Sequence, residues 1–256
     1  MKTSRRMHAH DKTKTWYEDS YRRQSFQAQR LYPNEELLRF FGHHFFRLDR
    51  AARRKVKVLE VGCGSCSNLW MVAREGFDAY GLDLSSEAIK LGQQMLARWN
   101  CEAELRIGSM TQLPYPNQNF DVVYDVVSSY CLNVKHFEVF LGELTRVLKP
   151  QGKLFMFTFS ANSDAFRDYA PAEKIDEWTL NGIYRRTSPY YGNFYPFRFS
   201  DPEDLTVRLT RAGIQVNQLE LINRTYHNRQ ETFQYISVEG TRVVGRFAPA
   251  PDPGTS

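Results

Sequence analysis

The sequence predicts an α/β fold built on a doubly wound, mostly parallel sheet of seven strands. Between residues 56 and 159, short apolar segments alternate with helical ones, a rhythm typical of parallel strands joined by right-handed crossovers. Two later segments alternate apolar and polar residues, which predicts a C-terminal antiparallel hairpin. We also expect an N-terminal helical lid and an aromatic-rich insertion ahead of the hairpin.

Length and composition favour one domain with additions at both ends. The chain has 256 residues, 42% of them hydrophobic, which is enough for a core of ordinary size. We expect residues 31–247 to form the domain, residues 1–30 a flexible basic arm and lid, and residues 248–256 a disordered tail. Part of the net charge of +5 lies in the arm. We interpret the arm as solvated, with residues 1–15 disordered.

The cysteines and the absence of long apolar runs predict a reduced, cytoplasmic protein. Cys63, Cys66, Cys101 and Cys131 do not form a disulfide framework. Cys63 and Cys66 make a CxxC, but no second pair follows at ligand spacing, so no metal is predicted. The sequence holds no run of 18 apolar residues and no apolar stretch near its start, which argues against a membrane span and a signal peptide.

The domain is expected to begin with an amphipathic helix over residues 31–48. Its apolar face carries Leu37, Leu38, Phe41, Phe45 and Leu48. Strands and helices then alternate, with Ser85 as a helix N-cap. The predicted elements are strand Val56–Val61, helix Ser67–Glu75, strand Asp78–Leu82, helix Ser85–Trp99, strand Glu104–Ile107, strand Phe120–Val127, helix Lys135–Leu148 and strand Lys153–Phe159.

After Ser160 the regular rhythm stops. Residues 162–199 hold ten aromatic and five basic residues without a clear period, which indicates an insertion or lid rather than a sheet layer. A helix is expected to resume at Ser200, because Ser200 and Glu203 form a capping-box pattern. Strands Ile214–Ile222 and Thr232–Val238 then pair around a turn at His227-Asn228.

The strongest functional signal is the glycine turn Gly62-Cys63-Gly64, directly after a strand and before a helix. Glycines let the backbone approach a ligand, and a helix start offers free N–H groups. Asp83 ends the next strand, 19 residues past Gly64, where a carboxylate accepts hydrogen bonds from ribose hydroxyls. A tight turn without a ligand is the alternative interpretation.

The residues around the turn favour S-adenosylmethionine over a dinucleotide. A dinucleotide fingerprint places its third glycine where this chain has Ser67. Glu60 precedes the turn, and a carboxylate there suits a ligand with an amino group better than a pyrophosphate.

Residues 55–160 resemble the class I, Rossmann-like S-adenosylmethionine-dependent methyltransferases. Four segments carry the resemblance: Val58–Gly64, Gly81–Ser85, Gly108–Tyr115 with Phe120–Tyr124, and Arg146–Lys153. The resemblance implies that the methionine moiety contacts Glu60, Gly62, Cys63 and Gly64. It also implies contacts of the ribose with Asp83, and of the adenine with Leu84, Ser109 and Met110. The family often has Asp at Ser109 and a third Gly at Cys66.

Two further regions are included among the cofactor contacts. Asp125 lies at the end of the fourth strand, where such sheets bind ligands. Trp16 and Tyr21, with Tyr17, resemble the aromatic N-terminal lid of small-molecule methyltransferases. Plain packing is the alternative for these three aromatics.

No catalytic base is assigned. Methyl transfer is an in-line displacement that positioning accelerates, and a base is needed only when the acceptor carries a proton. The candidates are Tyr130, Asn133 and His136. Many relatives have His near Asn133, so no base transfers from them. His136 also fits a surface helix, and Tyr130 fits either the methyl pocket or the core.

The acceptor is expected to contact the insertion. Its aromatic residues and arginines suit a sugar, a ring or an anion; the candidates are Tyr184, Arg185, Arg186, Tyr191 and Arg198. A solvated flap is the alternative. We therefore predict an O- or N-methyltransferase for a small polar acceptor, anionic or sugar-like.

Two other functions are weighed against this one. The first is a nucleic-acid or protein methyltransferase. Ser128–Cys131 lacks the prolines of base-amino methyltransferases, and the charge forms no nucleic-acid stripe. The second is a non-catalytic module that binds S-adenosylmethionine, which fold alone does not distinguish from an enzyme.

Overall fold

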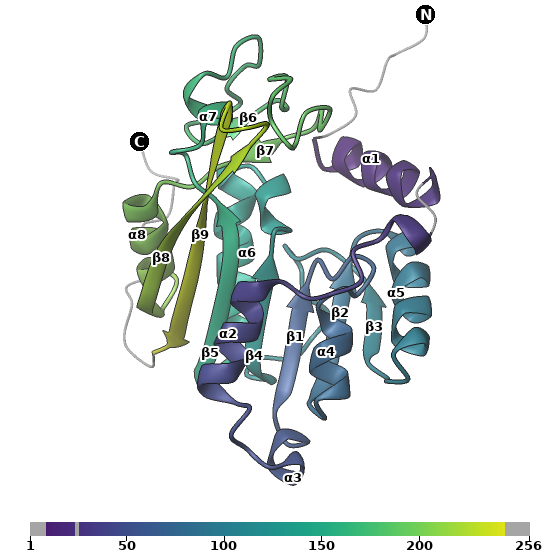
Figure 1. Ribbon diagram of the computed structural model, residues 1–256. Coiled ribbons are helices and arrows are strands. Elements are labelled where there is room, and N and C mark those ends of the chain that lie inside the picture. The colour runs from purple at the N-terminus through teal and green to yellow at the C-terminus, as the bar shows by residue number, and fades with distance from the viewer. Residues whose placement is uncertain (1–8, 24–25, 244–256) are drawn as a thin grey trace, which may run out of the picture.

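The computed structural model describes residues 9–23 and 26–243, with side chains from residue 13 onward. A seven-stranded sheet runs through the molecule in the order β3-β2-β1-β4-β5-β9-β8 (Figure 1). The strands are β1 Lys57–Val61, β2 Asp78–Asp83, β3 Glu104–Ile107, β4 Phe120–Val126, β5 Leu148–Phe159, β8 Ile214–Tyr226 and β9 Glu231–Arg242. The predicted fold class is confirmed, with β1 to β5 parallel and β9 antiparallel to both β5 and β8.

Helices cover both faces of the sheet and bury two separate apolar cores. One core holds side chains of α2 Glu35–His44, α4 Leu69–Arg74 and α5 Ser86–Arg98. The other holds side chains of α6 Val134–Val147 and α8 Pro202–Arg211. Because both faces are covered, the central strands are largely buried, as in β4, where six of the seven residues are buried.

The order of the strands reverses between β1 and β4, and the loops after them diverge at this point. Glu60 pairs with Gly81 and Val61 with Leu82 on one side, and Val61 pairs with Asp125 on the other. The register therefore brings the ends of β1, β2 and β4 to one edge of the sheet, where doubly wound folds bind ligands.

The N-terminal segment is more ordered than predicted. Residues 9–15 were expected to be disordered, but they belong to α1 Ala9–Arg23, which lies across the edge of the sheet where β1 and β2 end (Figure 1). The prediction was wrong because this polar segment gains its order from contacts with the domain. Residues 1–8 and the tail 248–256 lie outside the described residues.

The first helix of the domain also differs from the prediction. Helix α2 begins after its N-cap Asn34 and buries Leu37, Phe40 and Phe41, whereas Leu38 and Leu48 are each 38% exposed. Phe40 takes the inward place because residues 37, 40 and 41 share a helix face.

The cap of α8 was assigned to the wrong residue. Asp201 is the N-cap, accepting hydrogen bonds from the backbone of Glu203 and Asp204. Ser200 lies one residue before this N-cap and instead forms an isolated β-bridge with Ser160.

The insertion, the hairpin and the fifth strand are present as predicted, although some of their boundaries differ. The insertion contains α7 Asp164–Arg167 and a two-stranded sheet of β6 Thr179–Leu180 and β7 Phe197–Arg198. Short turns complete the chain, including α3 Arg50–Arg53, η1 Phe26–Ala28 and η2 Ser129–Cys131. The hairpin strands are longer than predicted, and positive φ angles at residues 227–229 close the turn. Helix α6 ends at Val147, and β5 starts at Leu148 rather than Lys153.

None of the helices within residues 9–23 and 26–243 combines the length and apolarity that crossing a bilayer requires.

Candidate active site

The glycine turn after β1 is compact because side chains from two distant segments press against it. Gly62 and Gly64 have φ angles of +65° and +51°, which favour glycine. A Cβ on Gly62 would lie 2.3 Å from Cβ of Ser128, and one on Gly64 would lie 2.8 Å from the Tyr21 hydroxyl. Conformation therefore favours glycine at both positions, and the close approach of Ser128 favours it further at Gly62.

Asp83 is held at the end of β2 with both carboxylate oxygens oriented. Oδ2 accepts a 2.8 Å hydrogen bond from the amide of Gly64, and Oδ1 accepts one of 2.9 Å from the amide of Ser85. Burial raises the pKa of Asp83, although these backbone hydrogen bonds oppose the shift. Each oxygen keeps a lone pair for a further donor, such as a ribose hydroxyl.

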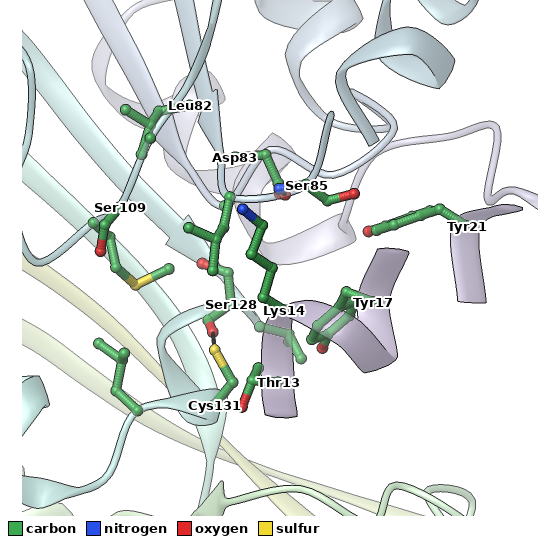
Figure 2. A pocket seen from close by; sticks show the side chains of 16 residues that line it. Thr13, Lys14, Tyr17, Tyr21, Leu82, Asp83, Ser85, Ser109, Ser128 and Cys131 are labelled. Carbon is green, nitrogen blue, oxygen red and sulfur yellow. Dashed lines mark hydrogen bonds between the residues drawn. The ribbon is translucent and has the colours of Figure 1, made fainter. Parts of the chain in front are cut away.

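A cavity opens in front of the turn and Asp83 (Figure 2). Of the predicted cofactor contacts, Gly62, Asp83, Leu84, Ser109, Met110 and Tyr21 line it. Sequence reasoning missed other lining residues, among them Thr13, Lys14, Ser85, Val127, Ser128, Cys131 and Leu132. Ser85 lies in the Gly81–Ser85 segment that carries the resemblance. The residues of α1 and of the segment after β4 reach the cavity only when these parts of the chain fold over the sheet edge.

Helix α1 forms one wall of this cavity. Thr13, Lys14, Tyr17 and Tyr21 all line it from α1. Figure 2 shows the Lys14 side chain extending from the helix toward Asp83. Trp16 lies outside this lining and packs on Tyr17 and Tyr195, with ring centroids 5.1 and 4.8 Å away.

Glu60 lies beneath the turn rather than in the cavity wall. Its carboxylate accepts hydrogen bonds of 2.7 Å from Nδ2 of Asn68 and 3.1 Å from the Tyr124 hydroxyl. Burial raises the pKa of Glu60 to about 8. Arg30 approaches the same group through Oδ1 of Asn68, at 2.7 Å. Cys63 and Gly64 form the turn above, with the amide of Cys63 bonded to the carbonyl of Leu82.

Asp125 is fully buried and shapes the loop after β4. Its Oδ1 accepts hydrogen bonds from the amides of Ser128 and Ser129, at 3.0 and 3.2 Å. The Ser128 hydroxyl lies 2.7 Å from the Val61 carbonyl and 2.5 Å from Oδ1 of Asp125. Asp125 thus holds Ser128 against Gly62, and it is Ser128 that lines the cavity.

The three candidate catalytic residues have different surroundings. Asn133 is the N-cap of α6, and its Oδ1 lies 3.0 Å from the amide of His136 and 2.8 Å from Nδ1 of the same residue. Tyr130 is buried, and its hydroxyl lies 2.6 Å from that of Tyr17 and 2.5 Å from that of Tyr195. Tyr130 is therefore the one of the three bonded to a side chain that lines the cavity.

The predicted acceptor-binding residues lie outside the cavity lining. Arg185 is paired with Glu231 at 2.5 Å and with Asp168 at 2.5 Å. Arg198 is 2% exposed, and its guanidinium lies 3.5 Å from the centre of the Phe137 ring.

The remaining three of these residues are partly or fully exposed. The Tyr184 ring stacks on Phe194 at 4.7 Å, and Tyr191 is 49% exposed beside it. Arg186 is exposed. Within the insertion, then, the arginines do not gather into one anion-binding cluster.

Comparisons with known proteins agree on the kind of domain. Residues 58–152 match the model of a family described as a methyltransferase domain. The chain is 34% identical over 127 residues to the phthiotriol/phenolphthiotriol dimycocerosates methyltransferase of Mycobacterium leprae, covering 49% of this chain and 42% of that protein. It is 38% identical over 125 residues to the fatty-acid O-methyltransferase of Mycolicibacterium smegmatis, covering 48% and 40%. The chain thus spans less than half the length of these relatives.

A solved structure extends the comparison to nearly the whole fold. The S-adenosylmethionine-dependent methyltransferase from Methanosarcina mazei aligns with a TM-score of 0.65, covering 83% of this chain and 100% of that chain. The sequence identity is 17%, so this likeness concerns the fold alone.

Proposed function

We propose that this chain, whose residues 58–152 form a methyltransferase domain of the Rossmann-like, S-adenosylmethionine-dependent class, binds that cofactor and transfers its methyl group to a small molecule. The single observation that carries the proposal is the oriented carboxylate of Asp83 beside the glycine turn. Two glycines with positive φ angles, next to an acid with unused lone pairs, fit a nucleoside at this cavity.

The residues that would hold the cofactor divide by chemistry. Asp83 accepts hydrogen bonds from ribose hydroxyls, while Leu84 and Met110 offer apolar surface to a base. Ser109 and Ser128 add hydroxyl groups to the same wall. When bound, the cofactor supplies an electrophilic methyl group on a sulfonium, and the chain itself supplies orientation and exclusion of water.

The acceptor proposed here is a small polar molecule methylated on oxygen or nitrogen. Tyr17 from α1, and Ser128 and Cys131 from the segment after β4, add polar side chains to the cavity lining. They suit a hydrogen-bonding acceptor. Since Arg185 is already paired with two carboxylates, a neutral or sugar-like acceptor is favoured over an anionic one. Because the Mycolicibacterium smegmatis relative is named a fatty-acid O-methyltransferase, fatty acids are the competing class of acceptor to be tested.

Calorimetry with S-adenosylmethionine and S-adenosylhomocysteine tests the cofactor assignment. A hydrogen bond to a charged group contributes about 1.5–3 kcal/mol. Asp83→Ala is therefore expected to lower the affinity for both ligands about tenfold or more. Asp78→Ala, at the other end of β2, is the matched control and should bind as the wild type does. If neither ligand binds the wild-type protein, the proposed function is wrong.

Methyl transfer is tested separately with a labelled methyl group. Sugars, small carboxylic acids, phenols, amines and fatty acids would be offered in turn, with Asp83→Ala as the reference that binds the cofactor more weakly. Tight binding of the cofactor without transfer to any of these classes would favour a non-catalytic binding module.

A further inference from the structure

Three tyrosines from distant parts of the chain bring their hydroxyls together beside the cavity. Tyr17 comes from α1, Tyr130 from η2 after β4, and Tyr195 from the insertion. The hydroxyl oxygens are 2.6 Å apart for Tyr17 and Tyr130, 2.5 Å for Tyr130 and Tyr195, and 3.1 Å for Tyr17 and Tyr195. We call this cluster the hydroxyl triangle.

Two members of the hydroxyl triangle are buried and Tyr17 is partly buried, so bulk water has little access to its hydrogen bonds. Tyr130 is 5% exposed and Tyr195 is 1% exposed. Burial raises the pKa of all three phenols, which remain protonated and able to donate at neutral pH. Three hydroxyls carry three protons, enough to close a ring in which each oxygen donates once and accepts once.

Side chains of α1 outside the hydroxyl triangle also contact the domain. Oε1 of Glu18 accepts a 2.8 Å hydrogen bond from the amide of Ser86, at the start of α5. The Tyr21 side chain rests over Gly64, and Trp16 packs on the Tyr195 ring. Tyr195 therefore takes part in both a polar and an aromatic contact between the insertion and α1.

A ligand in the cavity would contact α1, because four side chains of this helix form its wall. We infer that Tyr195 is a positioning residue that holds α1 over the cavity, so that the insertion controls how fast the cofactor exchanges. This inference rests on the proposed function, since it treats the cavity as the cofactor site. Tyr195 would thereby connect the insertion, where we expect the acceptor to bind, to α1, which forms a wall of the proposed cofactor site.

Removing one hydroxyl tests the attachment in the protein without any ligand. Tyr195→Phe keeps the ring against Trp16 and Tyr130 but deletes the hydrogen bonds to Tyr130 and Tyr17, of which only the bond to Tyr17 reaches α1. A net hydrogen bond contributes about 0.5–1.5 kcal/mol, so amide hydrogen exchange over residues 13–23 is expected to speed up about 3- to 10-fold.

A second tyrosine cluster provides the control. The Tyr235 hydroxyl also lies near two others, 3.0 Å from that of Tyr190 and 2.8 Å from that of Tyr226, and Tyr235 belongs to β9 rather than to the wall formed by α1. Tyr235→Phe should therefore leave exchange over residues 13–23 unchanged, even if it lowers the melting temperature equally. Equal acceleration by both variants would mean a general loss of stability and would overturn the inference.

The rate of cofactor exchange is the second measurement. S-adenosylhomocysteine is expected to dissociate about 3- to 10-fold faster from Tyr195→Phe than from the wild type, and at the wild-type rate from Tyr235→Phe. If Tyr195→Phe changes neither the dissociation rate of S-adenosylhomocysteine nor the amide hydrogen exchange over residues 13–23, the inference is wrong. Failure of the wild-type protein to bind S-adenosylhomocysteine would instead contradict the proposed function. The ligand-free exchange result would still decide the role of Tyr195 in holding α1.

Discussion

The carboxylate of Asp83 and the backbone amide of Gly64 form a 2.8 Å hydrogen bond that joins the end of β2 to the turn after β1. The two strands are neighbours, with Val61 paired to Leu82, so the acid and the turn meet directly at the sheet edge. Since Ser85 satisfies the other carboxylate oxygen in the same way, the acid is oriented by the backbone alone. The site is thus preorganised for a hydroxyl-bearing ligand.

The two glycines of the turn are expected to differ in their tolerance of a methyl group. Both variants place alanine in the left-handed region, which costs about 1–2 kcal/mol. Gly62→Ala also forces a Cβ to within 2.3 Å of the Ser128 Cβ, which lies close to the backbone. In Gly64→Ala the new Cβ comes close only to the hydroxyl end of the Tyr21 side chain. Urea denaturation should therefore show Gly62→Ala to be the less stable variant.

A second substitution separates the steric part from the conformational part. Tyr21→Phe in the Gly64→Ala background removes the oxygen that lies 2.8 Å from the new Cβ, so part of the lost stability should return. Ser128→Gly should do the same for Gly62→Ala. Full recovery in either pair would contradict the strain assigned to the positive φ angle.

Glu60 is expected to make stability depend on pH. Its pKa is about 8 in the folded protein, above the usual value of 4.5 that applies to the unfolded chain. The folded state therefore binds more protons in this range, and the free energy of unfolding falls as the pH rises from about 5 to about 8. Glu60→Gln should remove this decline in urea denaturation series.

The exposed Glu203 provides the control for this effect. Glu203→Gln should retain the wild-type pH profile. Parallel profiles for the wild type and Glu60→Gln between pH 5 and 8 would show that Glu60 is ionised in the folded protein throughout.

Arg198 is expected to contribute stability through its planar guanidinium. Nη1 donates a 2.6 Å hydrogen bond to the Ser200 hydroxyl, and the group stacks on Phe137. Lysine reproduces the charge but not the stacking or the fork of donors. Arg198→Lys should therefore lower the free energy of unfolding by about 1–3 kcal/mol. Arg186→Lys, at an exposed position, should change it by less than about 0.5 kcal/mol.

Asn133 is expected to act as a helix cap rather than in catalysis. Asn133 and Asn34 both cap a helix by accepting a 3.0 Å hydrogen bond from the residue three places later. Replacing either by alanine should cost about 1 kcal/mol of stability and leave methyl transfer per folded molecule unchanged. A loss of transfer in Asn133→Ala alone, with Asn34→Ala active, would assign Asn133 a direct role.

Part of the site was predictable because it depends on local order along the chain. A strand, a glycine turn, a helix and an acid at the end of the next strand follow one another within 30 residues, and their spacing alone places Asp83 beside Gly64. Leu84, Ser109 and Met110 line the cavity for the same reason, since each follows the end of a parallel strand.

The acceptor side could not be predicted in this way. Arg185 and Arg198 resemble a binding cluster in the sequence, but Glu231 and Phe137 engage them from distant segments. Apolar and charged residues in an irregular segment carry no period from which their partners can be inferred.

The sequence by itself determined the fold class, the glycine turn and the acid that faces it, because these depend on strand–helix alternation and on residues close in the chain. Only the tertiary structure decided that α1 forms a wall of the cavity, that Ser128 presses on Gly62, and that Tyr17 meets Tyr195. These contacts join residues 66 to 178 positions apart. Such pairs come together through packing of the whole domain, which no local pattern encodes.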